Sequence, residues 1–376
     1  MIIGIDVSSV MYGTGVSDYT RNLVASLLKI DKTNQYKLFF SSLRQPLPPE
    51  IKKLSAHPNV KIYHCKLPPL ALDFFWNRLH ILPIELFVGK CDVFHTSDWT
   101  QPPTIKARTV TTIHDLVPFL YPQWSHPKII DTHTRKMKWA VKLCRQFICV
   151  SQNTKTDLLK VFPQIDSHLC QVIYEAAEQK YFDFQKLPKA IQIQKKNKLK
   201  NLYDLDKFIL VQGTREPRKN LLNLSLAFEK FIKLNPKSKI IMAITGKKGW
   251  GQGVQSKSPH IKILGYIPES DMVTLHASAL FLAVPSLYEG FGLGVIKSIS
   301  VGVPVLTSTN SSLAEISNDC AVLVDPNSVN SIYLGLKKII TNSQFRAKLS
   351  TKALLQSKKF SWTKAARETL AVYNKL

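Results

Sequence analysis

One loop, residues 285–293, combines an acidic side chain with small residues, and its sequence is Pro-Ser-Leu-Tyr-Glu-Gly-Phe-Gly-Leu. An apolar run before it predicts a strand at 280–284, and the segment after it predicts a helix at 292–300. A turn of this kind directs backbone N–H groups and the positive end of a helix dipole at one point, which favours an anion. Glu289 would weaken such a site unless its carboxylate contacts a specific group. We therefore expect Glu289 to take part in ligand binding.

A second loop, residues 213–220, follows another predicted strand and carries two adjacent cations in the sequence Gly-Thr-Arg-Glu-Pro-Arg-Lys-Asn. Arg218 and Lys219 stand just before a predicted helix, where positive charge is unfavourable without an anion. Arginine offers a two-pronged donor to phosphate and lysine offers a point charge. The loop predicts a phosphate site, and a solvated basic turn is the alternative.

Two segments of the first half also lie at predicted strand ends. Residues 13–17 (Gly-Thr-Gly-Val-Ser) allow a close backbone approach, but they do not match the dinucleotide fingerprint, and an ordinary tight turn is the alternative. His114 closes the strand at 108–113 and is followed by Asp115. A histidine there can bond a substrate hydroxyl or move a proton near neutral pH, whereas a structural His–Asp pair is the other interpretation.

Alternating apolar runs and amphipathic stretches must position these residues, and they predict an α/β fold with parallel sheets. The expected strands lie at 2–5, 36–40, 60–63, 93–95, 108–113, 146–150, 171–174, 208–212, 239–245, 260–264, 280–284, 303–306 and 321–324. The expected helices lie at 17–28, 72–87, 126–143, 154–161, 221–234, 270–277, 292–300, 313–317 and 329–338. Because the pattern restarts after a Lys-rich segment at 179–200, that segment is the expected linker between two doubly wound domains. Ligands of such sheets bind beyond the carboxyl ends of the strands, so two facing domains would share a cleft.

The C-terminal segment is amphipathic, with Trp362, Ala366, Leu370 and Tyr373 at helical spacing. It predicts a helix that crosses back to the first domain, and a plain C-terminal core helix is the alternative. The expected domains are residues 1–185 together with the crossing helix 360–376, and residues 200–359.

Motifs along nearly the whole chain resemble the retaining glycosyltransferases of family 4, the glycosyl transferases group 1, which have the GT-B fold of two Rossmann-like domains. The matching segments are 13–17, 92–95, 112–116, 150–151, 213–220, 246–250, 264–268, 285–293, 302–304 and 312–315. Segments 213–220 and 285–293 are specific for the family, whereas 13–17 alone would be weak.

The resemblance implies a hexosyltransferase that takes a nucleotide-diphosphate sugar as its substrate, with no metal and no further cofactor. Catalytic roles would fall to Glu289, which would contact sugar hydroxyls, and to His114, which would reach the sugar from the acceptor domain. The implied donor-binding residues are Gly15, Arg218, Lys219, Phe291, Gly292, Leu293, Lys297 and Glu315. In many members an arginine stands at the position of Thr214 and contacts the diphosphate, and Arg218 would make that contact here. The cations and N–H groups would stabilise the charge of the diphosphate.

Lys297 departs from the family pattern, in which a second acid eight residues after Glu289 binds the ribose. A lysine has no acceptor for two ribose hydroxyls. Three outcomes are open: Glu315 or a backbone carbonyl takes the ribose, Lys297 pairs with a further phosphate or a neighbouring acid, or donor binding is weak. Lys297→Glu is expected to keep or raise activity if the site has only lost a ribose contact.

The chain has 376 residues and a net charge of +25, from 51 Lys and Arg against 26 Asp and Glu. This excess indicates an acidic partner, and it is interpreted either as solvated faces or as peripheral contact with an anionic membrane. Nucleic acid is not an expected partner, because no recognised motif accompanies the charge. The basic residues cluster at 189–200, at 135–145 on one expected helix, and at 337–359.

No apolar run is long enough to span a membrane, and the N-terminus lacks the basic start of a signal peptide. We therefore expect a cytoplasmic protein, with the inner membrane face as a second location. The six cysteines lack paired spacing and are expected to be reduced core thiols.

The leading interpretation is a transferase that moves a mannose- or glucose-type hexose from a GDP- or UDP-linked donor to a glycan or lipid-linked acceptor in surface polysaccharide or glycolipid synthesis. A phosphorylase or an epimerase is the enzyme alternative with the same fold. A non-catalytic or weakened GT-B protein that binds a nucleotide sugar or an anionic surface is the alternative from another class. The aromatic run Phe74, Phe75 and Trp76 predicts either acceptor surface or core.

Overall fold

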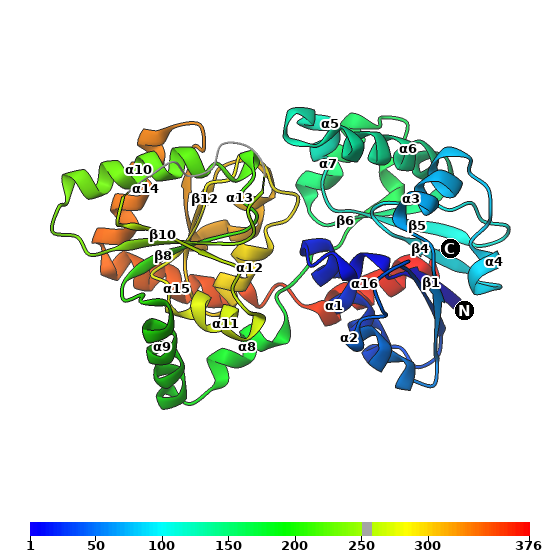
Figure 1. Ribbon diagram of the computed structural model, residues 1–376, viewed down its shortest axis with the longest axis horizontal. Helices are drawn as coiled ribbons and strands as arrows, with labels where there is room; N and C mark the ends of the chain where they lie inside the picture. Colours follow the sequence, from blue (N-terminus) through cyan, green and yellow to red (C-terminus); the bar gives the residue numbers. More distant parts are fainter. Residues whose placement is uncertain (250–257) are drawn as a thin grey trace. The chain divides into compact units, whose positions relative to one another are not determined.

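The computed structural model describes residues 1–249 and 258–376 and divides the chain into two compact units (Figure 1). The first unit comprises Met1–Glu175 and Trp362–Leu376, and the second comprises Ala176–Ser361. The sequence predicted a first domain that ends at residue 185 and a second that begins at residue 200, whereas the second unit begins at Ala176, because α8 (Gln179–Lys186) packs on its helices.

The first unit contains a parallel sheet of seven strands in the order β3-β2-β1-β4-β5-β6-β7. Its strands are β1 (Ile2–Asp6), β2 (Gln35–Ser41), β3 (Val60–Cys65), β4 (Val93–Thr96), β5 (Arg108–Ile113), β6 (Cys144–Cys149) and β7 (Cys170–Val172). Its α-helices are α1 (Gly15–Ile30), α2 (Pro49–Lys52), α3 (Pro69–Leu72), α4 (Glu85–Val88), α5 (Val117–Leu120), α6 (Pro127–Leu143), α7 (Gln152–Val161) and α16 (Trp362–Asn374). Strand β4 is buried at every residue and β6 at all but Arg145, as is typical of a sheet covered on both faces.

The second unit contains a parallel sheet of six strands in the order β10-β9-β8-β11-β12-β13. Its strands are β8 (Phe208–Gln212), β9 (Ile241–Thr245), β10 (Ile261–Gly265), β11 (Leu282–Val284), β12 (Val305–Ser308) and β13 (Ala321–Val324). Its other α-helices are α9 (Lys189–Tyr203), α10 (Leu221–Leu234), α11 (Glu269–Ser278), α12 (Leu293–Ser300), α13 (Ser311–Ser317), α14 (Val329–Thr341) and α15 (Ser343–Ser357). Helices α10 and α14 pack together on one face, and α11, α12 and α15 lie on the other (Figure 1).

Both sheets reverse their strand order at one point, between β1 and β4 and between β8 and β11. Ligands of doubly wound sheets bind at such switch points, beyond the carboxyl ends of the strands. The loops after β8 and β11 carry the two family-specific motifs, so the fold brings those motifs to one edge of the second sheet.

The C-terminal helix α16 packs on α1 of the first unit, which confirms the expected crossing. The Tyr373 hydroxyl bonds His95 Nδ1 at 2.7 Å, and the Trp362 ring meets Tyr19 edge-on. His95 Nε2 lies 2.8 Å from the Thr112 hydroxyl, so the helix is fixed to the sheet by a buried polar chain. Burial lowers the pKa of His95 to about 3, which keeps this histidine neutral.

The expected helix at 72–87 is wrong. The chain instead forms α3, one π-helical turn (η3, Asp73–Arg78), an irregular segment and the short α4. Pro83 cannot donate a helical hydrogen bond, and it disfavours the helical conformation of the residue before it. His80 and Leu82 also leave the helical conformation, with φ of 54° and 62°.

The expected linker at 179–200 is also wrong, because α8 and most of α9 occupy it. Both helices pack on α11. Helix α15 was missed by the sequence analysis, although Asn342 marks its start: its side chain accepts from the Phe345 N–H at 2.8 Å.

The basic group at 135–145 is not one solvated helix face. Lys136 is buried and donates to the Thr111 hydroxyl at 2.8 Å, Arg135 pairs with Asp73 at 2.7 Å, and Arg145 lies on β6. All six cysteines are free thiols and five are buried, as expected. Among the described helices, none combines the length and the apolar character that crossing a bilayer requires.

Candidate functional site

The loops after β8 and β11 are locked together at the switch point of the second sheet. The Asn220 side chain donates to the carbonyls of Pro285 and Pro326 at 2.9 and 2.6 Å, and the Leu287 N–H donates to the Arg218 carbonyl at 2.7 Å. Asn220 is buried with φ 56°, a conformation that asparagine tolerates better than most residues. These contacts fix the cations of one loop beside the acid of the other.

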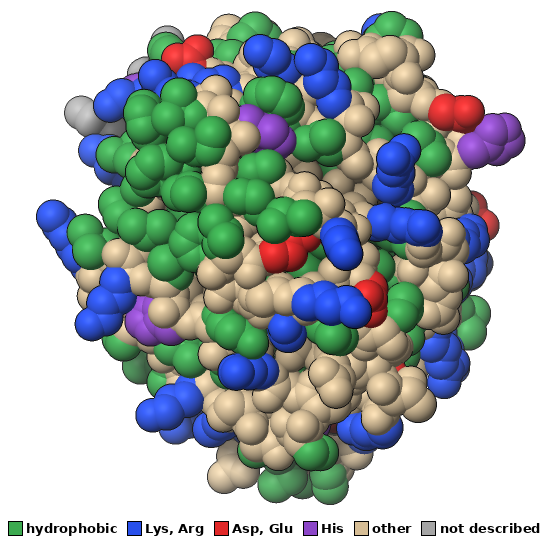
Figure 2. All heavy atoms as spheres, turned by 90° about the vertical axis from the view of Figure 1, so that its right-hand side faces the viewer, with side chains coloured by type: hydrophobic (Ala, Val, Ile, Leu, Met, Phe, Trp, Pro, Cys, Tyr) green, Lys and Arg blue, Asp and Glu red, His purple; other side chains and the backbone are tan. Residues whose placement is uncertain are grey.

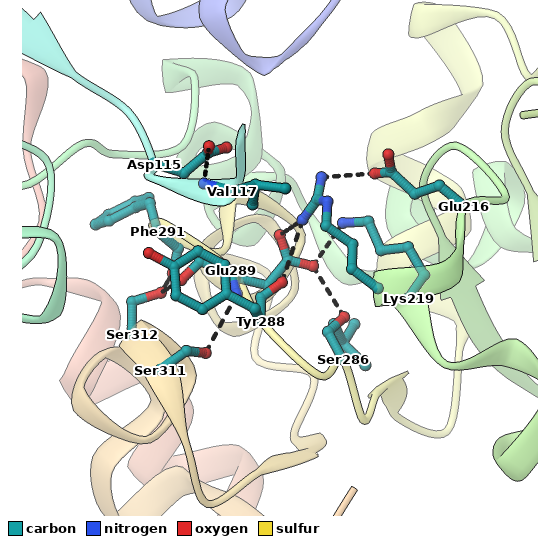
Figure 3. A network of polar contacts seen from close by, with 12 residues as sticks. Asp115, Val117, Glu216, Lys219, Ser286, Tyr288, Glu289, Phe291, Ser311 and Ser312 are labelled. Carbon is teal, nitrogen blue, oxygen red and sulfur yellow. Dashed lines mark hydrogen bonds and ion pairs between the residues drawn. The ribbon is translucent and has the colours of Figure 1, made fainter. Parts of the chain in front are cut away.

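Glu289 lies between the two cations and is only 7% exposed. Its Oε1 accepts from Lys219 Nζ at 2.6 Å and from the Ser286 hydroxyl at 2.9 Å (Figure 3). Its Oε2 accepts from Arg218 at 2.5 Å, and Arg218 also pairs with Glu216 at 2.6 Å. The carboxylates of Glu216 and Glu289 therefore balance the positive charge of the two cations before the helix.

The Glu289 carboxyl is ionised over the whole neutral range. Burial opposes its ionisation, but the charges of Arg218 and Lys219 and the hydrogen bonds outweigh burial and lower its pKa to about 2. A fixed negative charge beside two cations can accept hydrogen bonds from sugar hydroxyls while the cations face a phosphate.

Two serines at the start of α13 hold the backbone of the acidic loop. The Glu289 N–H donates to the Ser311 hydroxyl at 3.3 Å, and the Ser312 hydroxyl lies 2.8 and 2.7 Å from the carbonyls of Glu289 and Phe291, to which it donates (Figure 3). Gly292 then caps α12 with φ 113°, and Leu293 is the first helical residue. The first N–H groups of a helix have no partner within it, so this turn presents donors next to Glu289.

A small pocket opens at the same switch point, between the ends of β8 and β11. Its lining includes Gln212, Gly213, Lys219 and Ser286. Gly246, at the end of β9, has φ 118°, and a Cβ there would lie 2.1 Å from the Gly213 carbonyl oxygen. The glycine thus permits a close approach of its backbone to that of Gly213, which lines the pocket.

Lys297 is buried on α12 and pairs with Glu178 at 3.5 Å. Its Nζ also lies 5.7 Å from the centre of the Tyr181 ring, which meets His276 edge-on. His276 bonds Gln212 Oε1 at 2.9 Å, and burial followed by the charge of Lys297 lowers its pKa to about 3. Of the three outcomes open from the sequence, the structure supports pairing with a neighbouring acid.

The first unit has a separate polar pocket at its own switch point, lined by residues that include Asp6, Ser97, Asp98 and His114. His114 Nδ1 lies 3.4 Å from Glu175 Oε1, and the Tyr19 ring meets the imidazole edge-on. Burial acts to lower the pKa of His114, but the bond to Glu175 and the charges of Glu175, Asp98 and Asp115 outweigh burial and raise it.

The structure brings Glu289, Arg218 and Lys219 together and places Phe291, Gly292 and Leu293 at the adjoining helix start. Gly15, the first residue of α1, and His114 lie in the first unit, and Glu315 lies on α13. Trp250 of the 246–250 motif lies outside the described residues.

The sequence analysis missed several supporting residues: Glu178, Glu216, Asn220, Ser286, Ser311 and Ser312. Asn220, Ser286, Ser311 and Ser312 stand at loop ends, where asparagine and serine side chains commonly bond the backbone, so the sequence held a signal for these four. Nothing local to Glu178 indicated a partner on α12.

Two doubly wound units with a crossing C-terminal helix define the GT-B class of glycosyltransferase fold. Two family models match the chain: Glycosyltransferase Family 4 over residues 13–177, and Glycosyl transferases group 1 over residues 192–356. The chain belongs to this glycosyltransferase family.

Curated relatives and solved structures agree with this assignment. The O-antigen chain mannosyltransferase B of Escherichia coli is 25% identical over 376 residues, which cover 96% of each chain. The O-antigen chain mannosyltransferase RfbU of Salmonella typhimurium is 26% identical and covers 70% of this chain and 69% of its own. Among solved structures, the sucrose-phosphate synthase of Thermosynechococcus elongatus matches with a TM-score of 0.75 at 16% identity, covering 100% of this chain and 98% of its own. Anabaena Alr3699/HepE, solved with UDP-glucose, matches with a TM-score of 0.72 at 14% identity and covers 100% of both chains.

Proposed function

We propose that this glycosyltransferase is a retaining hexosyltransferase that moves a mannose-type sugar from a GDP- or UDP-linked donor to a glycan or lipid-linked acceptor in surface polysaccharide synthesis. The observation that carries the proposal is the buried Glu289 held between Arg218 and Lys219 at the switch point of the second sheet. The choice of mannose is supported by the two O-antigen mannosyltransferase relatives.

Each part of this cluster has a role in donor binding. Arg218 and Lys219 take the diphosphate, and the N–H groups at the start of α12 add neutral donors to it. Glu289 accepts from hydroxyls of the transferred sugar. As the bond to the sugar breaks, negative charge grows on the leaving diphosphate, and preorganised cations stabilise that charge without moving.

The charge of these two side chains can replace a metal ion, so we propose that the reaction needs none. Activity should persist unchanged in excess EDTA. Dependence on Mg²⁺ or Mn²⁺ would contradict this part of the proposal.

The first unit is proposed to hold the acceptor, with His114 serving the reacting sugar and Gly15 at the phosphate side. The support is the polar pocket at the switch point of the first sheet, whose Asp6, Ser97 and Asp98 can bond sugar hydroxyls. We propose Glu315 as a further donor contact. A peripheral location at the inner membrane face would suit a lipid-linked acceptor.

The test is a panel of nucleotide sugars with detection of the released nucleoside diphosphate. Wild-type protein should turn over one mannose donor well above the others. Glu289→Gln and Lys219→Met should lose at least about 100-fold in turnover, in line with the loss of a preorganised charge contact. Lys352→Met, on an exposed position of α15, is the matched control and should keep full activity.

A folded Glu289→Gln protein with wild-type turnover would refute the site. Melting curves of each variant separate a lost contact from a lost fold. The anomeric configuration of the product, read by NMR, tests retention.

A further inference from the structure

Gln212 is the last residue of β8 and lies at the switch point of the second sheet. Side chains alternate across a strand, so Ile209 and Val211 pack in the apolar core with α10 and α14, whereas Gln212 faces the side that carries α11 and α12. The Gln212 side chain is half-buried and lines the small pocket between the ends of β8 and β11, which we name the donor pocket. A polar amide is thus placed at the site by the register of a buried strand.

His276 on α11 fixes the direction of this amide. Its Nε2 lies 2.9 Å from Gln212 Oε1, and its Nδ1 lies 2.7 Å from the Ser298 hydroxyl on α12. A carboxamide oxygen can only accept a hydrogen bond, so Nε2 carries the ring proton and Nδ1 accepts from Ser298. Burial and then the charge of Lys297 lower the pKa of His276 to about 3, so the ring is neutral and holds this one proton.

The oxygen of the amide is also held from the side of α12. A Cβ at Gly294 would lie 3.3 Å from Gln212 Oε1, so this oxygen lies against the first turn of the helix. The His276 ring is itself fully buried and meets the Tyr181 ring edge-on, with ring centres 5.6 Å apart. Because Oε1 is fixed between α11 and α12, the amide nitrogen must point in another direction.

The amide nitrogen of Gln212 is available to a ligand. It carries two N–H donors, and within the part of the chain that the structure describes no residue accepts from either of them. The nitrogen is not sealed from solvent, and Lys219 lines the same donor pocket. A Cβ at Gly213 would lie 3.5 Å from Lys219 Nζ, so the ammonium group lies close to the residue after Gln212. An ammonium group and a fixed amide N–H together favour an oxygen-rich anion.

Positive charge alone does not mark a binding site on this protein. Lys and Arg side chains are spread over the face shown in Figure 2, and the net charge is +25. A neutral donor whose direction is set by a buried histidine is a more specific feature, because nothing but a ligand can use it.

We propose that Gln212 is a further donor-binding residue, whose Nε2 donates to a phosphate oxygen of the nucleoside diphosphate, and that His276 is the positioning residue that aims it. Lys219 supplies charge from a flexible side chain, whereas the amide supplies a hydrogen bond of fixed direction. Such a preorganised donor also stabilises the charge that grows on the leaving diphosphate. The inference rests on the proposed function, because the ligand is the nucleotide part of the sugar donor.

The first test measures the affinity of purified full-length protein for GDP and UDP by titration calorimetry. Gln212→Leu keeps the size of the side chain without its amide, and it should bind the preferred nucleotide at least about tenfold more weakly, as expected for the loss of one hydrogen bond to a charged group. Gln212→Glu should bind more weakly still, because a carboxylate repels the phosphates. The matched control is Gln356→Leu on α15, which removes a bond to the Ile316 carbonyl and should leave the affinity unchanged.

A double-mutant cycle tests the role of His276. His276→Phe should weaken nucleotide binding in the wild-type background and change it by less than about twofold in the Gln212→Leu background, because the ring acts through the amide. His276→Gln keeps an N–H near the position of Nε2 and should recover most of the affinity. The matched control is His260→Phe, which removes a bond to the Ile240 carbonyl and should leave binding unchanged.

Comparison of the preferred nucleotide with its 2′,3′-dideoxy form locates the contact. An equal loss for both forms in Gln212→Leu supports the phosphate, whereas a loss that disappears for the dideoxy form would place the amide on the ribose and overturn the assignment. Wild-type affinity of folded Gln212→Leu, or an equal effect of His276→Phe in both backgrounds, would also overturn the inference. Absence of nucleotide binding by wild-type protein would contradict the proposed function and this inference together, whereas wild-type binding with no effect of Gln212→Leu contradicts this inference alone.

Discussion

The ion pair between Lys297 and Glu178 predicts the outcome of a charge swap. Lys297→Glu places a second carboxylate against Glu178, where the two charges now lie 3.5 Å apart. At an effective dielectric constant near 20, a pair of charges at that distance interacts by about 5 kcal/mol. Because Glu178 keeps 15% of its side chain exposed and has Lys180 nearby, we expect a loss of about 2–4 kcal/mol in the free energy of unfolding of the second unit.

That loss corresponds to a fall of about 5–15 °C in melting temperature for a unit of this size. From the sequence alone we expected Lys297→Glu to keep or raise activity. This expectation needs revision, because the single variant would lose stability, and that loss would mask any gain in binding of the ribose. Glu178→Lys should destabilise by a similar amount. The double variant Glu178→Lys with Lys297→Glu restores an ion pair and puts an acid where most of the family has one.

The assay combines thermal melting with the affinity for a nucleoside diphosphate and for its 2′,3′-dideoxy form. The double variant should recover most of the melting temperature and bind the ribose form at least as well as wild-type. If Lys297→Glu melts within about 2 °C of wild-type, the ion pair contributes little and the reasoning fails. If the single variant melts normally but loses nucleotide affinity, Lys297 contacts the ligand directly.

Other predictions follow from the two pockets. The ionised Glu289 stabilises the wild-type protein above pH 4.5, and this contribution, on the order of 3 kcal/mol, is lost as pH falls toward about 2. Glu289→Gln should remove it, so the free energy of unfolding should differ less between acid and neutral pH in the variant than in wild-type. An unchanged acid profile would contradict the lowered pKa. Gly246→Ala should destabilise the second unit by more than about 2 kcal/mol, because its Cβ meets the Gly213 carbonyl, and a wild-type melt would contradict the close approach. Glu175→Gln should lower the pKa of His114 in an NMR titration. Because the pKa of His114 is raised in the wild-type protein, its protonation stabilises the fold below pH 6.5, and this stabilisation is lost as pH rises through the pKa of the folded state. An unchanged pKa of His114 in the variant would contradict the pairing with Glu175.

Much of the fold was predictable because its strands are short apolar runs that end in loops with distinctive residues. Strands β5, β8 and β13 and helix α10 begin and end at the expected residues. Helix α9 was taken for a linker because its Lys-rich sequence has no apolar stripe, and only Gln192 and Leu199 are buried. Its helical state depends on packing against α11, which no local pattern reveals.

The candidate site was predictable where single residues carry the chemistry and not where partners meet across the fold. Glu289, Arg218 and Lys219 stand in recognisable motifs, but their mutual pairing requires that β8 and β11 be neighbours. Glu178 reaches Lys297 only because α8 packs on α12. Lys297 stands where most of the family has an acid, and in the structure it pairs with the carboxylate of Glu178.

Transfer from a nucleotide sugar is the central claim, and direct detection of product tests it. Wild-type protein is incubated with GDP-mannose, UDP-glucose and their relatives, a mannose-containing acceptor and EDTA, and the released nucleoside diphosphate is compared with that from Glu289→Gln. We predict release from a mannose donor by wild-type protein and a loss of at least about 100-fold in the folded variant. Absence of release, together with no thermal stabilisation by any nucleotide, would contradict the assignment of transferase activity to this chain.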